Sequence, residues 1–146
     1  NYIQKKLIDI NYHIYGSPKY LEKHGFPKNI NDLNKHSFIS FGRGAPSPVY
    51  NPDWALKLGI KDNKKRKTVM KVNSVYGLLL AVQSGVGLAA LPDYITVNQP
   101  NIVKVLPNIE GPITEAHFVY PQSMKNVARV QAFRNFLYSK ISEWEF

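Results

Sequence analysis

The most regular pattern of apolar and polar positions in this chain spans Val72–Pro92. Asn73 and Ser74 carry short oxygen-bearing side chains of the kind that cap a helix, and an apolar stripe at helical spacing follows over residues 78–82. Gly85 is the residue type that ends helices in the left-handed conformation, and the run after it is almost wholly apolar. Such a run is typical of a strand covered on both faces in the parallel sheet of an α/β domain. The pattern therefore predicts a capped helix, a tight turn and a buried strand.

Shorter apolar runs predict the other elements. Residues 7–15 and 37–41 are rich in β-branched, aromatic and other apolar side chains, which favours a strand in each. The patterns of residues 54–58 and 68–72 also predict strands, on either side of a charged turn, and together they predict a segment resembling a hairpin. From Asn126 onward apolar residues recur every three or four positions, which predicts an amphipathic C-terminal helix that needs a partner surface.

Two positions are candidates for binding a small anion. A helix start beside the end of a buried strand favours negative charge through its free amides and its dipole, and Ser74 lies at such a start. The alternative is that this segment is only a helix-to-strand connection within a core. The second candidate is Arg43, the only cationic residue in the loop from Gly42 to Pro52. Its guanidinium suits a carboxylate, although an ordinary solvent-facing arginine explains it as well.

Length and composition limit the class of protein. With 146 residues, 44% of them hydrophobic and 20% charged, the chain suits one globular domain, or one complete lobe with part of another. No apolar run is long enough to cross a bilayer. Cysteine is absent, which excludes disulfides and thiolate metal sites and is compatible with a reducing cytoplasm. The sequence starts at Asn1 with no leader pattern, so we expect it to be a piece of a longer protein.

The formal charge of +9 raises the possibility of nucleic-acid binding. The dense part of this charge is the basic run Lys61–Lys71, which contains no aromatic residue on which a base could stack. Lysine also outnumbers arginine in the chain, whereas arginine is the usual reader of base edges. A solvated loop explains the basic run at least as well, and a nucleic-acid-binding module remains the alternative.

No sequence pattern supports an enzyme. The four histidines are scattered without metal-type spacing, and the serines lack a nucleophile-elbow motif. Gly85 and Gly87 lie between a predicted helix and a predicted strand, which is the reverse of the order in a dinucleotide fingerprint. We therefore assign no catalytic residue, no metal ligand and no cofactor.

Four blocks of sequence, taken in order, resemble the effector-binding domain of LysR-type transcriptional regulators. They are Gly16–Gly25 with Pro27, Asp32–Phe41, Asn73–Pro92, and Phe118–Pro121 followed by Val127–Leu137. Trp54, ahead of the charged turn, resembles the branch of the family with a tryptophan in that loop. The resemblance implies an α/β fold of the periplasmic-binding-protein type (type 2), with one Rossmann-like lobe and part of a second lobe.

The resemblance also implies a domain organisation. Residues 17–106 would form the second lobe of the effector-binding domain, and residues 1–16 and 107–146 would form hinge strands and the C-terminal remnant of the first lobe. The front of the first lobe and a DNA-binding winged helix-turn-helix would lie outside this sequence. The implied partners are a small effector, often an organic acid, and further copies of the chain in a dimer, or a tetramer of the full-length protein. The implied location is the cytoplasm.

The family's effector site is carried over to positions on two segments of this chain: Phe41, Gly42, Arg43, Asn73, Ser74 and Val75. The first lobe would supply the other half of the site, so we expect this chain by itself to bind an effector weakly or not at all. The alternative within the same fold is a solute-binding protein of a transporter. The upstream sequence would distinguish the two, since a regulator carries a helix-turn-helix there and a transporter component carries a signal peptide.

Overall fold

The computed structural model describes residues 1–42 and 51–144, which belong to two compact units. The larger unit spans Asn11–Pro112, and the smaller unit combines Asn1–Ile10 with Ile113–Phe146. Arg43, one of the site residues expected from the sequence, lies outside the described residues.

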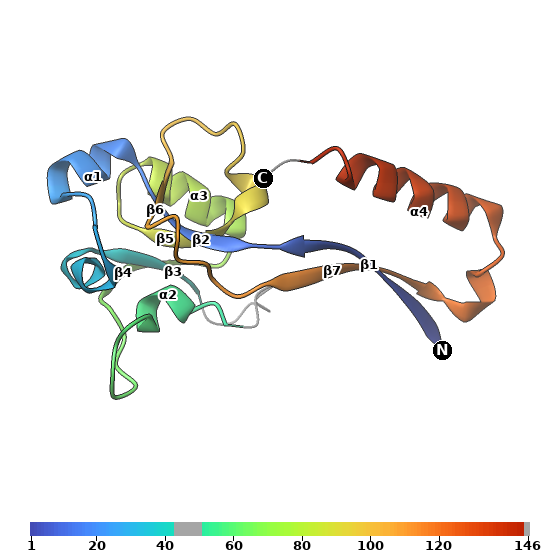
Figure 1. Ribbon diagram of the computed structural model, residues 1–146, viewed down its shortest axis with the longest axis horizontal. Coiled ribbons are helices and arrows are strands. Elements are labelled where there is room, and N and C mark those ends of the chain that lie inside the picture. Colours follow the sequence, from blue (N-terminus) through green and yellow to red (C-terminus); the bar gives the residue numbers. More distant parts are fainter. Residues whose placement is uncertain (43–50, 145–146) are drawn as a thin grey trace. The chain divides into compact units, whose positions relative to one another are not determined.

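A mixed β-sheet forms the centre of the larger unit (Figure 1). Strand β2 (Tyr12–Gly16) lies between β5 (Ala89–Pro92) and β6 (Val103–Val105), and it pairs antiparallel with both. Strands β3 (Phe38–Phe41) and β4 (Thr68–Val72) pair in parallel. Only the second half of the predicted strand, from Ala89, is thus a strand, and it includes Pro92. Its ladder to β2 is antiparallel, so the sheet is not the purely parallel one that we expected.

Two hydrogen bonds join β3 and the residue before it to Leu88, which immediately precedes β5. The Ile39 amide donates to the Leu88 carbonyl at 2.8 Å, and the Leu88 amide donates to the Ser37 carbonyl at 2.9 Å. Gly87, beside these bonds, has no room for a side chain, because a Cβ there would lie 2.6 Å from the Ser37 carbonyl oxygen. The β3–β4 pair therefore lies directly beside the β5–β2–β6 group.

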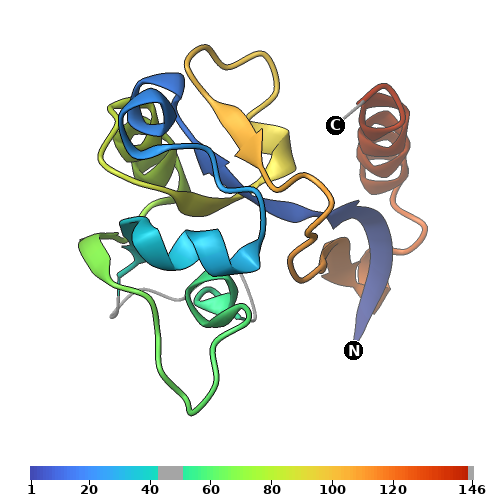
Figure 2. The ribbon, with the colours of Figure 1, turned by 60° about the vertical axis from the view of Figure 1, so that its left-hand side comes forward.

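Helices cover both faces of this sheet. Helices α1 (Pro18–His24) and α3 (Val75–Gln83) lie on one face, and the short helix α2 (Trp54–Lys57) lies on the other (Figures 1 and 2). The described residues also form three short 3-10 helices: η1 (Ile30–Lys35), η2 (Asp93–Ile95) and, in the smaller unit, η3 (Gln122–Met124). The core beneath α3 is apolar and consists of Tyr15, Ile39, Leu78, Leu79, Val82, Ala89 and Leu91.

The strand and hairpin predicted for residues 54–72 are wrong in part. Residues 54–57 form α2, in which the Leu58 amide donates to the Trp54 carbonyl at 3.0 Å and closes one helical turn. Three consecutive apolar residues fit a buried strand and a buried helical turn equally well, so the pattern did not distinguish them. Because β4 pairs in parallel with β3, the segment between them is a crossover rather than a hairpin.

The smaller unit contains a two-stranded antiparallel sheet and the helix α4. Strand β1 (Tyr2–Ile10) pairs with β7 (Thr114–Pro121), from Tyr2 opposite Pro121 to Ile10 opposite Thr114. The predicted C-terminal helix is α4 (Ala128–Ile141), whose Tyr138 hydroxyl donates to the Lys6 carbonyl at 2.8 Å. No residue of α4 is buried among those described. Its apolar residues Phe133 and Phe136 are about half exposed.

A buried carboxylate cross-links three elements of the larger unit. Asp93, at the start of η2, is only 4% exposed. Its Oδ1 accepts from the Tyr15 hydroxyl at 2.8 Å and lies 2.8 Å from His13 Nδ1, and its Oδ2 accepts from Lys104 Nζ at 3.1 Å. Burial, the largest cause, raises the pKa of the Tyr15 hydroxyl, which therefore remains a donor at neutral pH. Through these contacts the carboxylate links β2 and β6 to the residue that follows β5.

We predict that Asp93→Asn lowers the free energy of unfolding by about 2 kcal/mol, because it removes the charge that Lys104 and Tyr15 face inside the protein. Urea denaturation followed by circular dichroism measures this. Asp9→Asn is the matched control, because Asp9 pairs with Lys6 at an exposed position and should cost less than about 0.5 kcal/mol. If the two variants lose the same free energy of unfolding, the buried network stabilises the protein no more than the exposed ion pair does.

A buried histidine makes stability dependent on pH. His36 is 6% exposed, its Nδ1 lies 3.3 Å from the Tyr20 hydroxyl oxygen, and burial lowers its pKa below the ordinary value of 6.5. Below pH 6.5 the unfolded chain therefore binds a proton that the folded chain resists, so stability decreases as the pH falls. Urea titrations at pH 7 and at about pH 5 should show this loss. His36→Gln should reduce it, whereas His117→Gln at an exposed position should not.

Candidate functional site

The ends of β3 and β4 lie together at one edge of the sheet. Phe41 is opposite Val72 in the parallel register, and the Gly42 amide donates to the Val72 carbonyl at 2.8 Å. Parallel strands bring their carboxyl ends to the same edge, which is where α/β sheets hold ligands. The chain then passes from Val72 through Asn73 and Ser74 into α3, so the start of this helix lies beside the end of β3.

Ser74 is the N-cap of α3. Its extended backbone (φ −139°, ψ 132°) precedes the helix, and its hydroxyl accepts from the Gly77 amide at 3.2 Å. The first helical bond runs from the Leu78 amide to the Ser74 carbonyl at 2.9 Å, so the amides of Val75 and Tyr76 have no acceptor within the helix. Asn73, Ser74 and Tyr76 are exposed. The positive end of the helix dipole is therefore accessible to solvent.

Gly77 allows α3 to begin so close to β4. A Cβ at this position would lie 2.6 Å from Val72 Cγ1, which is closer than side-chain carbons approach one another. Any larger residue would therefore push the first turn of α3 away from the end of β4. By contrast, a Cβ at Gly42 would lie 3.6 Å from the Asn73 nitrogen, an ordinary contact distance. The geometry of the helix start thus depends on Gly77 rather than on Gly42.

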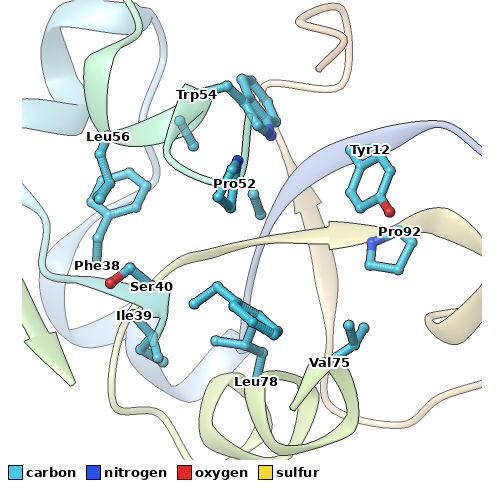
Figure 3. A pocket seen from close by; sticks show the side chains of 13 residues that line it. Tyr12, Phe38, Ile39, Ser40, Pro52, Trp54, Leu56, Val75, Leu78 and Pro92 are labelled. Atoms are coloured by element: carbon cyan, nitrogen blue, oxygen red, sulfur yellow. The ribbon is translucent and has the colours of Figure 1, made fainter. Parts of the chain in front are cut away.

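A narrow pocket opens beside these elements, between the ends of the strands, α2 and α3 (Figure 3). It encloses about 500 Å³ of space between atoms, including the part open to solvent, and about 30 Å³ of it admits the centre of a water molecule. Its described walls are mostly apolar and carry no charged side chain: Tyr12, Phe38, Ile39, Ser40, Phe41, Pro52, Trp54, Ala55, Leu56, Val75, Leu78, Ala90 and Pro92. In its present shape the pocket admits only a small group.

Two of the site residues expected from the sequence line this pocket, and the other three that the structure describes adjoin those two in the chain. Phe41 and Val75 line it, and both are partly buried. Gly42 follows Phe41 and is partly buried, and Asn73 and Ser74 precede Val75 and are exposed. These five residues are close together because Gly42 bonds to Val72.

Several lining residues were not anticipated from the sequence. Tyr12 lies in β2, far along the chain from residues 41–43 and 73–75, and Pro92 ends β5, the strand that follows α3. Trp54 was noted only as part of a motif, and the expected strand would have placed it differently from the helix that is present. Their proximity follows from sheet order, which no local pattern specifies.

Residues 61–67 of the basic run form an exposed loop with one buried member, and the last residues of the run belong to β4. Arg66 is 6% exposed, and its Nη1 and Nη2 donate to the carbonyls of Ala55 at 2.9 Å and Ile30 at 3.2 Å. Lys65 forms an ion pair with Asp53. Lys61, Lys64 and Lys67 are exposed and, with their neighbours, line a shallow hollow of the surface. Arg66 therefore anchors the loop to α2 and η1 and is not available to a partner.

The described residues contain neither a metal-binding cluster nor a membrane-spanning helix. No group of three or more histidine and carboxylate side chains in residues 1–42 and 51–144 is arranged to hold a metal ion. In the same part of the chain, no helix has the length and apolar character needed to span a membrane.

Comparison with known proteins identifies the class of this domain. The family model described as the LysR substrate binding domain matches residues 1–141. The chain therefore belongs to this family, which provides the effector-binding domain of LysR-type transcriptional regulators. The resemblance inferred from the sequence blocks is confirmed, as is the α/β fold of the periplasmic-binding-protein type.

Particular relatives support the same assignment. An uncharacterized HTH-type transcriptional regulator of Haemophilus influenzae is 29% identical over 124 residues, and the match covers 82% of this chain and 41% of that protein. The regulatory domain of CrgA, a LysR-type regulator from Neisseria meningitidis, superposes with a TM-score of 0.77 at 23% identity, over 96% of this chain and 69% of that one. Full-length AphB from Vibrio cholerae gives a TM-score of 0.68 at 18% identity, and the match covers 94% of this chain and 47% of AphB. These structural likenesses concern the fold.

We predict that Ser74→Ala destabilises the protein by about 1 kcal/mol, because the Gly77 amide then loses its acceptor at the start of α3. Thermal or urea unfolding measures this change. Ser74→Asp retains a capping oxygen and should leave the stability nearly unchanged. This variant separates loss of the cap from other effects of substitution at this position. A Ser74→Ala variant as stable as the original chain would show that the cap contributes little.

Proposed function

We propose that this domain senses a small anionic molecule, of the organic-acid class, at the start of α3. The site consists of the residues expected from the sequence: Phe41, Gly42, Arg43, Asn73, Ser74 and Val75. The observation that carries the proposal is the exposed, Ser74-capped helix start beside the end of β3, with free amides at Val75 and Tyr76. Such amides bind carboxylates and phosphates without a charged side chain.

Electrostatics favours an anion over a neutral or cationic ligand. The described walls of the pocket carry no charged side chain, so the partial positive charge at the start of α3 is the main charge beside the pocket. The formal charge of the chain, +9, adds a long-range attraction for anions. Arg43 adjoins Gly42 in sequence, and we propose it as a second contact because its paired donors match a carboxylate.

We further propose that the domain belongs to a DNA-binding regulator that assembles as a homo-oligomer. The Haemophilus relative is an HTH-type regulator and is more than twice as long as the region matched here, which supports a separate DNA-binding part. In the proposed organisation, residues 17–106 form the second lobe, and residues 1–16 and 107–146 contribute hinge strands and part of the first lobe. An effector changes regulation only if it binds one lobe arrangement better than another, because equal affinity shifts no equilibrium.

We predict that small carboxylates bind this chain and that their primary amides bind at least about tenfold more weakly, because the amide lacks the charge that the helix start attracts. Isothermal titration calorimetry with matched pairs such as propionate and propionamide measures the difference. Weak binding is expected, since this chain provides only part of the proposed site.

Substitution at the cap tests the location. Ser74→Asp keeps α3 capped but places a negative charge at the proposed anion position, so carboxylate binding should be lost. Ser123→Asp adds the same charge at an exposed position of η3 and should leave binding unchanged. If amides bind as tightly as acids, or if both variants weaken binding equally, the proposed anion site is wrong.

A further inference from the structure

Trp54 carries a buried hydrogen-bond donor that has no acceptor. The residue is 8% exposed, and its indole Nε1 finds no protein partner within hydrogen-bonding distance in the described structure. Buried tryptophan N–H groups usually have a partner, because leaving one unpaired costs about 1–3 kcal/mol. Gly111 lies against the same ring, since a Cβ there would be 2.6 Å from the indole Cε2. The indole is therefore tightly held with its single donor unsatisfied.

The other unpaired buried side-chain atom among the described residues has a simpler explanation. It is Arg66 Nε, and the same guanidinium already donates to the carbonyls of Ala55 and Ile30 through its two terminal nitrogens. A guanidinium has five N–H donors, so it commonly leaves one of them without an acceptor, whereas the indole has a single N–H donor. Trp54 is thus the group whose chemistry requires a partner.

Trp54 belongs to the wall of the pocket described above. Figure 3 shows the indole at the rim of the pocket, with its nitrogen on the side that faces Pro52 and Tyr12. The space of about 30 Å³ holds a group of only a few heavy atoms, because one water-sized sphere needs about 10–15 Å³. The described walls are uncharged and largely apolar, so a neutral oxygen acceptor costs less to bury there than a charged group does.

We infer that the Trp54 indole N–H is a specificity-determining contact for the effector, and that the effector is a short organic acid carrying a second, neutral oxygen acceptor such as a carbonyl. This inference rests on the anion site proposed above, because Val75 belongs both to the α3 start and to the pocket that Trp54 lines. The carboxylate occupies the helix start, and the carbonyl enters the pocket and accepts from Nε1. An acid without such an acceptor leaves the donor unpaired and binds less tightly.

Pyruvate and isobutyrate are a matched pair of probe molecules for this contact. Both are small carboxylates of the same size, but only pyruvate has a keto oxygen. The full chain, labelled with ¹⁵N, gives indole N–H signals for its two tryptophans, Trp54 and Trp144, and Trp144→Phe assigns them. We expect pyruvate to move the Trp54 indole signal saturably and isobutyrate to leave it in place.

The substitution Trp54→Phe removes the donor and keeps an aromatic ring. It should weaken pyruvate binding about tenfold, to the level at which isobutyrate binds the unsubstituted chain. Trp144→Phe is the control and should alter neither affinity. Because Trp54 is buried, the thermal midpoint of the variant is measured first, to show that the variant is folded. The indole signal of the unsubstituted chain tests the same contact without any change to the pocket.

The outcomes separate this inference from the proposal on which it rests. If acetamide, a neutral acceptor, moves the Trp54 signal as pyruvate does and carboxylates have no advantage, the Trp54 contact is supported and the anion site is overturned. If both acids bind equally and the Trp54 signal responds to neither, the anion site is supported and the Trp54 inference is overturned. No saturable change at Trp54 with pyruvate or acetamide also overturns it.

Discussion

The parallel pairing of β3 with β4 is the constraint on which the candidate site depends. It places Phe41 beside Val72 and joins Gly42 to Val72 by a backbone hydrogen bond, so both strands end at one edge of the sheet. The chain leaves β4 directly into the Ser74 cap, and the absence of a side chain at Gly77 lets α3 start against Val72. The position of the free amides therefore follows from backbone geometry and not from a flexible charged side chain.

The rest of the sheet supports this edge from the side. The link between β3 and Leu88 connects the parallel pair to β5, and β5 continues into the buried Asp93 with its contacts to Tyr15 and Lys104. Burying a carboxylate has a large desolvation cost, which is offset only when several donors surround it, as they do here. Strands β2 and β5 also provide Tyr12 and Pro92 to the pocket, so the residues that fix the sheet and those that shape the site are neighbours.

Local features were predictable from the sequence, and features that depend on tertiary packing were not. The Ser74 cap, the left-handed Gly85 (φ +80°) and the strand that ends at Pro92 are encoded by residue types at fixed short spacing. The helix at Trp54 was missed because a run of three apolar residues has no period that separates a helical turn from a strand. The burial of Arg66 was also missed, since its carbonyl partners Ala55 and Ile30 lie 11 and 36 residues away in the chain and no local pattern relates them to it.

The candidate site was predictable to the same extent. The helix start and the strand end could be identified because each has a local signature, and their proximity was expected only through the family resemblance. The unpaired indole of Trp54 has no sequence signature, because it depends on how α2 packs near Gly111 and the strands. A pocket assembled from β2, β3, β5, α2 and α3 becomes visible only when the order of the strands is known.

The most direct measurement follows the backbone amide signals of Val75 and Tyr76 by ¹H–¹⁵N NMR while propionate is added. We expect these two amides to shift first and saturably, because they are the free donors at the start of α3. Unchanged signals at both residues, with the shifts confined to the exposed lysines of the basic run, would contradict the claim that this helix start is the anion site.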